Sequence, residues 1–505
     1  MRLQDLLVGL PEADLVGNPD TPVSDICYDS RAVRPGSLFV AMRGLNVDGH
    51  DYIRQALAAG ASAVAVGAGS ESKWRPVVEG LHAPVLVVGN TRVALARLAA
   101  AFHGYPARRL RVIGVTGTDG KTSLCHLLAH VFNATGNKAG LISTAECRIA
   151  DQLLPDTGRY TTPEAPEVQA MLAQMVAADC EWAVMEATSH GLALHRVDDC
   201  EYDIAAFTNL TSDHLDFHGS LGEYRAAKGR LFSMLDDSVD KGIAKTAILN
   251  ADDPACGYFA SLTNARVKTY GVSAPPDISA HSLTADGWST QLMLRADDQE
   301  ISVHFPRPGA FNVSNALAAT GVALAAGLDL ETIARGLESW PGAPGRMELI
   351  EEGQQFTVVV DFAHAPDSLR RVLEHLRGSS RGRIVAVFGC IGERDKDRRF
   401  AMGRVAAEHA DYTIVTDDNP YSEDPDAIIT EIARGLEFGG KRLGHDFAVV
   451  PDRREAIAQA LAMAVDEDVV LLAGKGHEMQ VHLAGSSYDC NDAEMARQVL
   501  RELPG

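Results

Sequence analysis

The sequence contains few cysteines and no paired cysteine motif. Its eight cysteines are spread over 505 residues, and none of them forms a Cys-x-x-Cys spacing. A disulfide-stabilised secreted domain carries a much denser cysteine framework, so that class of protein is excluded. Reduced thiols in a cytoplasmic protein are the simplest interpretation, and we expect a cytoplasmic location.

The chain also lacks an excess of basic residues. It has 46 lysines and arginines against 68 aspartates and glutamates, which gives a formal net charge of -22. Proteins that bind the phosphate backbone of nucleic acids concentrate Lys and Arg, so this balance disfavours nucleic acid as a partner. Any anionic ligand must therefore meet local clusters of positive groups.

Long hydrophobic runs are almost missing. Acidic residues interrupt the leucines of residues 1–17, which argues against a signal peptide. The one long stretch without charge, residues 308–328, is rich in Ala and Gly and contains Pro308, Asn312 and Asn315. It predicts a buried helix rather than a membrane span. We expect a protein that is not embedded in a membrane.

Apolar strand-like runs alternate with helix-like segments, which is typical of α/β proteins with mainly parallel sheets. The length suggests about three domains, and turn-forming residues at 103–106 and 341–345 suggest their boundaries. We predict a smaller N-terminal α/β domain at 1–107, a central P-loop-like ATPase domain with a mainly parallel sheet at 108–342, and a C-terminal Rossmann-like α/β domain at 343–505. Examples of the runs expected to form strands are 61–66, 85–88, 112–115, 182–185, 204–208, 357–360, 384–388, 412–415 and 469–473.

A glycine-rich turn follows the strand-like run that ends at Val115. Residues 114–122 read Gly-Val-Thr-Gly-Thr-Asp-Gly-Lys-Thr. Glycines permit backbone angles that bring several N–H groups onto phosphate oxygens, and the following helix presents its positive end to the same anion. Lys121 would reach the β- and γ-phosphates, and Thr122 would ligate Mg²⁺. The glycine spacing departs from the strict P-loop pattern, but the strand, turn and helix are all expected, so we predict a nucleoside triphosphate site.

Carboxylate, imidazole and hydroxyl groups follow two more strands of the central segment. Residues 186–191 come after one strand-like run and residues 209–219 come after the next. A parallel sheet would aim both groups at the phosphate loop. Glu186 is the best carboxylate for Mg²⁺, which prefers oxygen ligands and keeps several waters. A zinc site is disfavoured because His214 and His218 lack the intervening Glu of a zinc-protease helix, and each histidine alone is more often a turn or packing residue.

Several ordered motifs over nearly the whole chain resemble those of the Mur ligases. They are the Gly-Thr-x-Gly-Lys-Thr loop, Glu186-x-x-Ser-His-Gly-Leu, Asn209-Leu-x-x-Asp-His-Leu-Asp-x-His-Gly, Phe311-Asn-Val-Ser-Asn315, Asp361-Phe-Ala-His364-Ala-Pro-Asp367, Asp418-Asn-Pro and Gly474-Lys-Gly-His-Glu478. The resemblance is to the branch of this family that adds a diamino acid to UDP-N-acetylmuramoyl-L-alanyl-D-glutamate in peptidoglycan synthesis. It implies an amide ligase that uses ATP and Mg²⁺ and forms an acyl phosphate. The UDP-muramoyl dipeptide and a diamino acid would be its partners, and the oligomeric state stays open.

The resemblance implies roles for residues of the phosphate loop and its surroundings. Lys121, Lys228 and His214 would be catalytic, and Lys228 would be carbamylated, with an ordinary surface lysine as the alternative. Asp119 stands where Asn is usual and adds negative charge near ATP. The implied ATP-binding residues are Gly117, Thr118, Asp119, Gly120, Lys121, Thr122, Ser123, Asn315 and Asp361, with the last two at adenine and ribose. The implied metal ligands are Thr122, Glu186, His214 and Lys228.

By the same resemblance, the first domain would hold the uridine nucleotide and the central domain the muramoyl peptide. Arg196 could pair with a carboxylate through its forked donors. Leu194 and Tyr160 stand where relatives often have polar amide residues. The implied residues are Tyr28, Ser30, Leu45, Asn46, Val47, Tyr160, Thr161, Thr162, Thr188, Leu194 and Arg196.

The C-terminal domain would bind the acceptor amino acid. Family members that add meso-diaminopimelate resemble one another in having Arg after Asp-Asn-Pro, where this chain has Tyr421. A phenol cannot give the distal carboxylate a charge-assisted bidentate contact. We therefore expect L-ornithine or L-lysine, with meso-diaminopimelate and a compensating Arg398 or Arg399 as the alternative. The implied residues are Arg394, Asp418, Asn419, Pro420, Tyr421, Gly474 and Glu478.

Two rival functions remain at this point. A related ligase, such as a folylpolyglutamate synthase, would share the phosphate loop but not the Asp-Asn-Pro and Gly-Lys-Gly-His-Glu motifs. A nucleotide-binding regulatory module without catalysis would not need Lys121, Glu186, His214 and Lys228 together. The sequence therefore favours the ligase that adds a diamino acid.

Overall fold

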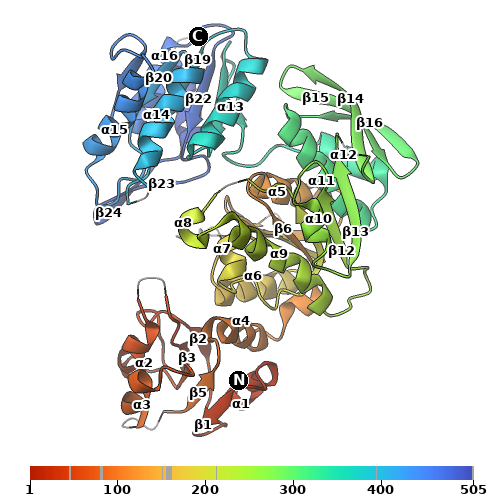
Figure 1. Ribbon diagram of the computed structural model, residues 1–505, viewed down its shortest axis with the longest axis vertical. Helices are drawn as coiled ribbons and strands as arrows, with labels where there is room; N and C mark the ends of the chain where they lie inside the picture. The colour runs from red at the N-terminus through yellow and green to blue at the C-terminus, as the bar shows by residue number, and fades with distance from the viewer. Residues whose placement is uncertain are drawn as a thin grey trace. The chain divides into compact units, whose positions relative to one another are not determined.

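A computed structural model of the chain describes residues 1–44, 47–79, 83–150, 152–154, 162–211, 213–273, 275–393 and 395–502 (Figure 1). The chain forms two compact units. The first consists of Met1–Thr284, Gln291–Phe305 and Ala310–Trp340, and the second of Ala285–Thr290, Pro306–Gly309 and Pro341–Gly505. Among the described helices, none is long and apolar enough to cross a membrane. The predicted domain boundaries at 107/108 and 342/343 stay predictions.

The first unit begins with a five-stranded sheet in the order β1-β5-β4-β3-β2. Strands β2 to β5 are parallel, and β1 is antiparallel to β5. Successive side chains of a strand point to opposite faces, so Leu38 and Val40 enter one core while Phe39 enters another. The elements are α1 (Leu3–Leu6), β1 (Asp14–Val16), β2 (Asp25–Cys27), β3 (Ser37–Val40), α2 (Ile53–Ala58), β4 (Ala63–Gly67), α3 (Glu71–Glu79), β5 (Val85–Val88) and α4 (Thr91–Phe102).

An eleven-stranded sheet forms the rest of the first unit, in the order β16-β15-β14-β13-β12-β11-β6-β10-β7-β8-β9. Its middle strands, β13, β12, β11, β6, β10 and β7, are parallel. The elements up to α9 are β6 (Arg111–Thr116), α5 (Lys121–Ala134), β7 (Ala139–Ile142), β8 (Cys147–Ile149), β9 (Gln152–Leu153), α6 (Ala165–Ala177), β10 (Trp182–Glu186), α7 (Ser189–Ala193), β11 (Tyr202–Phe207), α8 (Leu215–His218) and α9 (Leu221–Asp237). The remaining elements are β12 (Thr246–Asn250), α10 (Cys256–Ala260), β13 (Arg266–Gly271), β14 (Ile278–Asp286), β15 (Ser289–Ala296), β16 (Gln299–Phe305), α11 (Ala310–Ala325) and α12 (Leu330–Glu338).

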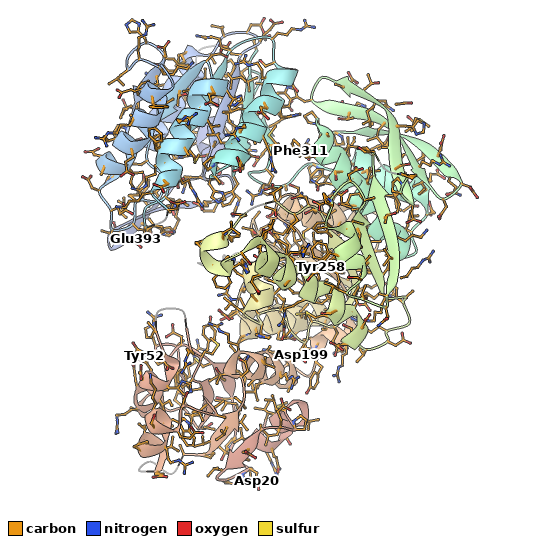
Figure 2. All side chains as sticks on the ribbon, in the orientation of Figure 1. Asp20, Tyr52, Asp199, Tyr258, Phe311 and Glu393 are labelled. Atoms are coloured by element: carbon orange, nitrogen blue, oxygen red, sulfur yellow. The ribbon has the colours of Figure 1, made fainter. Side chains whose placement is uncertain are left out.

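Helix α11 confirms the buried helix predicted for the charge-free stretch. Its buried side chains include Val313, Ala316 and Leu317, while Phe311 at its start is exposed (Figure 2). Polar residues cap several helices of this unit, for example Ser220, whose hydroxyl accepts a hydrogen bond from the Glu223 backbone N–H at the start of α9. Such a cap satisfies a backbone donor that the helix itself leaves unpaired.

The second unit contains a six-stranded sheet in the order β17-β18-β22-β19-β20-β21. All its strands are parallel except β17. Ile384 and Phe388 of β19 pack with α13 to α15, whereas Val385 packs with α16 and α17, so helices cover both faces as predicted for a Rossmann-like domain. The elements are β17 (Glu348–Ile350), β18 (Thr357–Asp361), α13 (Pro366–Ser379), β19 (Ile384–Phe388), α14 (Asp397–His409), β20 (Tyr412–Val415), α15 (Pro425–Phe438), β21 (Phe447–Val449), α16 (Arg453–Met463), β22 (Val469–Ala473), β23 (Gln480–Leu483), β24 (Ser486–Asp489) and α17 (Asp492–Glu502).

Candidate active site

The phosphate loop lies between β6 and α5, and its backbone requires glycine at two positions. Gly117 and Gly120 have φ angles of 151° and 82°, which residues other than glycine rarely adopt. A Cβ at Gly117 would collide with the Thr208 hydroxyl, and one at Gly120 would lie 2.8 Å from Asn315 Oδ1. The structure therefore places Asn315, predicted to contact adenine, directly beside the loop.

The segment after β11 holds the loop in shape. The backbone N–H of Thr118 donates to Asn209 O at 2.8 Å, and that of Asp119 donates to Asn209 Oδ1 at 3.0 Å. The Thr208 hydroxyl donates to Asp119 O at 2.7 Å. Thr208 and Asn209 were not among the predicted site residues, although they follow a strand at the edge of the sheet where such residues are expected.

Lys121, Thr122 and Ser123 form the first turn of α5, next to the carboxylate at the end of β10. Lys121 Nζ donates to Thr118 O at 2.8 Å and lies 3.9 Å from Glu186 Oε1. The Thr122 hydroxyl donates to Glu186 Oε2 at 2.9 Å. The register of the parallel strands aligns Glu186 with Val115, at the end of β6. The sheet thus brings together the three side chains that the sequence singled out.

Thr144 is a further member of this group that the sequence reasoning missed. Its backbone N–H and its hydroxyl both donate to Glu186 Oε2, at 3.0 Å and 2.8 Å. Thr144 follows β7, which is parallel to β10 and adjacent to it. Its place after a strand at the same edge of the sheet was the signal that could have found it.

The oxygens of Thr122 and Glu186 suit Mg²⁺, which prefers oxygen ligands. In the part of the chain that the structure describes, no group of three or more His, Cys, Asp or Glu side chains is arranged to hold a metal ion. A site with one or two protein ligands still fits Mg²⁺, because this ion usually keeps waters and takes phosphate oxygens from its substrate. The arrangement therefore fits a nucleotide-bound magnesium ion better than a protein-enclosed metal.

Lys228 lies in α9 behind the phosphate loop and is only 1% exposed. Its Nζ donates to Gly117 O at 2.5 Å and lies 4.3 Å from the centre of the Tyr224 ring. Burial, and then repulsion from Lys121, hold the pKa of Lys228 well below its usual value. The alternative of an ordinary surface lysine is wrong, and the neutral amine is favoured.

His214 precedes α8 and lies among other imidazoles. Its ring centre is 4.7 Å from that of His190, and its Nε2 is 3.3 Å from Asp213 Oδ2. Burial, followed by repulsion from Lys121 and Lys228 and opposed by Asp213, lowers the pKa of His214. Burial and the neighbouring imidazoles lower the pKa of His190 to about 4. Both histidines are therefore neutral at pH 7, which suits donation or acceptance of a hydrogen bond.

The predicted muramoyl-peptide residues of the central segment come together around Thr162. The hydroxyls of Thr162 and Thr188 lie 2.8 Å apart, and Thr188 caps α7 by accepting a hydrogen bond from the Gly191 backbone N–H. Arg196 is 8% exposed, and its Nη1 donates to Thr162 O at 3.1 Å. Leu194 ends α7 without a polar side chain, so any hydrogen bond expected there must come from another residue.

The predicted uridine-nucleotide residues are only partly described. The Tyr28 hydroxyl donates to Glu167 Oε1 at 3.0 Å, Ser30 is buried, and Val47 is exposed. Four further predicted residues of the nucleotide and peptide sites lie outside the described residues: Leu45, Asn46, Tyr160 and Thr161.

The second unit gathers the predicted acceptor residues after β20 and β22. Asp418 is 2% exposed, and among the described residues neither of its carboxylate oxygens has a hydrogen-bond partner. Asn419 Nδ2 donates to Glu478 Oε2 at 2.7 Å, and the buried Lys475 Nζ donates to the same oxygen at 2.9 Å. Burial raises the pKa of Asp418, although Lys475 opposes the shift. Lys475, 3.9 Å from Asp418 Oδ1, is a member of this group that was not predicted.

Two glycines pack closely against the residues around Asp418. A Cβ at Gly474, whose φ is 103°, would lie 3.0 Å from Asp418 Oδ2, and one at Gly392 would collide with the Pro420 carbonyl.

Asp361, predicted at the ribose, ends β18 and accepts hydrogen bonds from the backbone N–H groups of Ala363 and Met347, each at 2.8 Å.

The position of Tyr421 is set by a local contact with β23. Its φ is 53°, its N–H donates to His482 O at 3.0 Å, and the two rings stack with centres 5.7 Å apart. Arg399, considered above as a compensating residue, is buried and pairs with Glu423 and Glu431, both at 2.9 Å; its contact with the acceptor stays a prediction. Arg394 lies outside the described residues.

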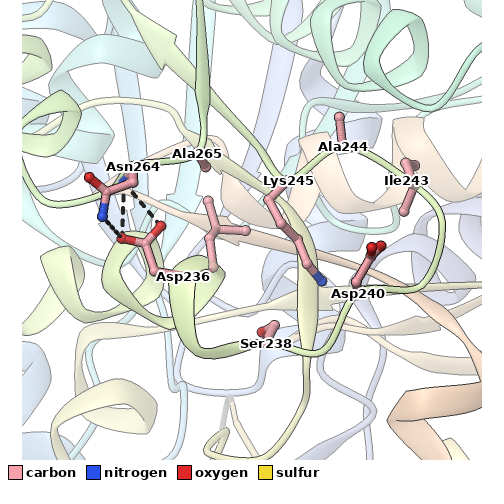
Figure 3. Close-up of a pocket in the computed structure, with 9 residues that line it drawn as sticks. Asp236, Ser238, Asp240, Ile243, Ala244, Lys245, Asn264 and Ala265 are labelled. Carbon is pink, nitrogen blue, oxygen red and sulfur yellow. Dashed lines mark hydrogen bonds between the residues drawn. The ribbon is translucent and has the colours of Figure 1, made fainter.

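A pocket of about 460 Å³ is lined by none of these residues (Figure 3). Its lining comes from the end of α9, the segment that leads to β12 and the residues just before β13, among them Asp236, Lys245 and Asn264. This is the amino edge of the parallel strands, whereas the phosphate loop follows the carboxyl edge. Asp236 accepts hydrogen bonds from Asn264, and Lys245 pairs with Asp203 at 2.9 Å. The lining side chains thus serve the fold.

Comparisons with known proteins agree over the whole chain. Three family models match: the Mur ligase family catalytic domain at residues 22–103, the Mur ligase middle domain at 115–323, and the Mur ligase glutamate ligase domain at 345–476. A UDP-N-acetylmuramoyl-L-alanyl-D-glutamate--2,6-diaminopimelate ligase of Bacillus licheniformis is 41% identical to this chain, and the match covers 100% of both chains. A UDP-N-acetylmuramyl-tripeptide synthetase of Roseiflexus sp. (strain RS-1) is 43% identical over 100% of this chain and 99% of its own. A solved structure titled as a UDP-N-acetylmuramoyl-L-alanyl-D-glutamate--2,6-diaminopimelate ligase superposes with a TM-score of 0.66 at 29% identity, covering 99% of both chains.

Proposed function

The chain belongs to the Mur ligase family, ATP-dependent ligases of peptidoglycan synthesis with a three-domain α/β fold, and from this premise we propose that it joins meso-diaminopimelate to UDP-N-acetylmuramoyl-L-alanyl-D-glutamate. The observation that carries the proposal is the 41% identity, over the full length of both chains, to a relative named for that reaction. The rival of a non-catalytic module loses its support, because the side chains that the reaction needs converge at one sheet edge.

The expectation of L-ornithine or L-lysine needs correction. It rested on Tyr421 alone, whereas the full-length relatives named for an acceptor name 2,6-diaminopimelate. Glu423, a carboxylate two residues after Tyr421, pairs with Arg399 rather than standing open to a cationic substrate. Because the Tyr421 ring stacks on that of His482, the identity of this residue can reflect local structure as well as substrate. A residue other than Tyr421 must then meet the distal carboxylate of the acceptor.

In the proposed reaction the γ-carboxylate of the D-glutamyl residue attacks the γ-phosphorus of ATP, forming an acyl phosphate and releasing ADP. The acceptor amine then attacks the acyl carbon, phosphate leaves, and the amine gives up a proton as the amide forms. The main demand is to offset negative charge where phosphoryl and carboxylate groups meet. Lys121 provides a cation for this, and the loop N–H groups orient the phosphates.

Thr122 and Glu186 would hold Mg²⁺, which would supply positive charge that offsets the repulsion between the phosphates and the attacking carboxylate. Thr144 positions Glu186 by donating two hydrogen bonds to one of its oxygens. His214 completes the proposed site as a neutral imidazole beside the phosphate loop. Each of these roles is a proposal from the placement of the side chain.

Lys228 is proposed to carry a carbamate. A neutral amine attacks CO₂, forming an N–C bond and releasing a proton, and burial favours that neutral amine. The product would place an anion behind the loop. Intact mass measurement of the wild-type chain kept in bicarbonate should show an added carboxyl group that Lys228→Met lacks. Masses that differ only by the substitution itself would contradict the proposed carbamate.

The acceptor is proposed to bind in the second unit. Asp418 offers two buried carboxylate oxygens, and a buried carboxylate without hydrogen bonds is costly. An ammonium group of the acceptor would satisfy them. Lys475 and Asn419 fix Glu478 beside this point, so the pair of carboxylates suits a substrate with amino groups.

Phosphate release tests the proposed function. With ATP and Mg²⁺, the wild-type chain should release phosphate only when both the UDP-muramoyl dipeptide and meso-diaminopimelate are present. Lys121→Ala should lower the rate by about 100-fold or more, as expected for losing a cation at the transferred phosphoryl group. Lys138→Ala is the control, because Lys138 is an exposed lysine that donates to Ala178 O. Phosphate release without the dipeptide or the acceptor would contradict the proposal.

A further inference from the structure

A buried glutamate of the first unit lies between two arginines. Glu164 precedes α6 and is 7% exposed. Its Oε1 is 2.7 Å from Arg196 Nη2, and its Oε2 is 3.9 Å from Arg92 Nη1. One carboxylate therefore has two guanidinium groups within reach, and the closer contact is with Arg196.

The surroundings connect this pair with the proposed peptide site. Arg196 donates to Thr162 O, and the Thr162 hydroxyl contacts that of Thr188. Arg196, Thr162 and Thr188 are the residues proposed above to bind the muramoyl peptide. Glu164 thus occupies one side of the guanidinium that a substrate carboxylate would approach.

A guanidinium binds a carboxylate in the same way whether the carboxylate belongs to the chain or to a ligand. The D-glutamyl residue of the proposed substrate has two carboxylates, and the γ-carboxylate is consumed in the reaction. Its α-carboxylate persists in both substrate and product. Two carboxylates would then compete for one arginine, unless one of them has another cation nearby.

We propose that Glu164 is an internal competitor that controls substrate binding: the α-carboxylate of the D-glutamyl residue takes the place of Glu164 on Arg196, and the Glu164 carboxylate turns onto Arg92. This inference rests on the proposed function. Glu164 never loses a cationic partner during the exchange, which avoids the cost of an unpaired buried charge. When the product leaves, Glu164 returns to Arg196, so the competition also favours release.

Other titratable groups near this pair do not provide the same competition. Glu167 lies one turn further along α6 and accepts a hydrogen bond from Tyr28 rather than from an arginine. Burial raises the pKa of Glu167, and the nearby Glu164 adds to the shift. The positive charge of Arg196 contributes to the lowered pKa of His190, which is neutral at pH 7. The exchange therefore concerns Glu164 and the two arginines.

Calorimetric binding to the full chain, without ATP or acceptor, tests the inference. The ligands are UDP-N-acetylmuramoyl-L-alanyl-D-glutamate and its analogue with an α-carboxamide in place of the α-carboxylate. Glu164→Gln removes the competing charge, and should tighten binding of the acid about fivefold or more while changing binding of the amide by less than about twofold. Glu164→Asp, which shortens the reach to Arg196, should shift binding in the same direction.

Glu201→Gln is the matched control. Glu201 is another largely buried carboxylate of the first unit, paired with Arg108 at 3.0 Å, and its substitution should leave both affinities unchanged. Steady-state assays add a second readout, since Glu164→Gln should lower KM for the dipeptide and should not raise kcat.

Two results would overturn the inference. Weaker binding of the acid in both Glu164 variants would show that Glu164 positions Arg196 instead of competing for it. An equal gain for acid and amide would show a general effect of charge. Failure of the wild-type chain to bind the acid at all would be a different result, because it would contradict the proposed function itself.

Discussion

At the residue scale, the site depends on a few side chains that share one carboxylate. Glu186 Oε2 accepts hydrogen bonds from Thr122 and twice from Thr144. Charge-assisted hydrogen bonds of this kind are short and strong, and they fix the direction in which a carboxylate presents its other oxygen. The proposed metal ligand is therefore oriented before any ligand arrives.

Thr144→Val tests this orientation. Valine keeps the shape and the backbone donor but removes the hydroxyl that contacts Glu186. We expect kcat to fall by about tenfold, the size of one such hydrogen bond, and the half-saturating Mg²⁺ concentration to rise. Titration of Mg²⁺ in the phosphate-release assay measures both. Thr135→Val is the control, because the Thr135 hydroxyl donates to carbonyls of α5 and accepts from Asn137 Nδ2. An equal effect in both variants would contradict the role of Thr144.

Asp199 is a second residue whose environment predicts a measurable effect (Figure 2). Burial is the main cause that raises the pKa of Asp199 to about 6. Above that pH the folded chain must carry a buried charge that the unfolded chain exposes to water, so Asp199 lowers stability at neutral pH. The cost disappears as the pH falls from about 6 towards the ordinary value of about 3.9.

Asp199→Asn should therefore raise the melting temperature at pH 7.5 by about 2 °C or more, and change it little at pH 4.5. Asparagine tolerates the left-handed backbone found at this position, where φ is 57°. Asp297→Asn is the control, since Asp297 has a φ of 51° and is exposed. A gain that is the same at both pH values would show that burial of the charge is not its cause.

At the element scale, the predictive signals were strongest where apolar runs form the interior strands of parallel sheets. The runs predicted at 85–88, 384–388 and 412–415 have the bounds of β5, β19 and β20. A buried parallel strand must be apolar on both faces, which leaves a clear pattern. β14 was not among the predicted examples; it exposes most of its residues and so lacks that pattern.

The candidate site was likewise predictable only in part. Lys121, Thr122 and Glu186 were predictable, because phosphate and metal chemistry restricts the residue types that follow a strand. Thr144 and Lys475 were not singled out, since each acts through another side chain, although Lys475 lies within the motif Gly474-Lys-Gly-His-Glu478. The expected acceptor rested on one position, Tyr421, whose ring also stacks on His482, so this residue alone does not identify the acceptor.

The join between β6 and α5 gives a prediction for an element boundary. Gly120 and Gly136 lie just before and just after α5, with φ angles of 82° and 84°. Alanine at either should cost about 1 kcal/mol from backbone strain. Only Gly120 has a neighbour, Asn315, within reach of the new methyl group, whereas Gly136 faces open space.

Gly120→Ala should therefore raise KM for ATP by about tenfold or more, because the loop and Asn315 must both shift, while Gly136→Ala should leave it unchanged. Both variants should melt at similar temperatures. A similar KM in the two variants would contradict the placement of the nucleotide at this loop. Comparing the two variants separates the backbone strain, which both share, from the contact with Asn315, which is specific to Gly120.

At the scale of the whole molecule, the proposed chemistry is divided between the two units. The phosphate loop, Glu186, Lys228 and Arg196 belong to the first unit, and the proposed acceptor residues around Asp418 belong to the second. A ligase needs both parts, because the acyl phosphate becomes an amide only when an acceptor amine reaches the acyl carbon. The full chain is therefore the smallest piece in which the reaction should be complete.

One measurement tests the central claim most directly. The full chain is incubated with ATP, Mg²⁺, UDP-N-acetylmuramoyl-L-alanyl-D-glutamate and equal concentrations of meso-diaminopimelate, L-lysine and L-ornithine, and the product is identified by its mass. The proposed function predicts a product with one added diaminopimelate, at least about tenfold more abundant than either alternative, which corresponds to about 1.4 kcal/mol of discrimination. A product that carries lysine or ornithine would show that Tyr421 did report the acceptor, and it would contradict the proposed acceptor.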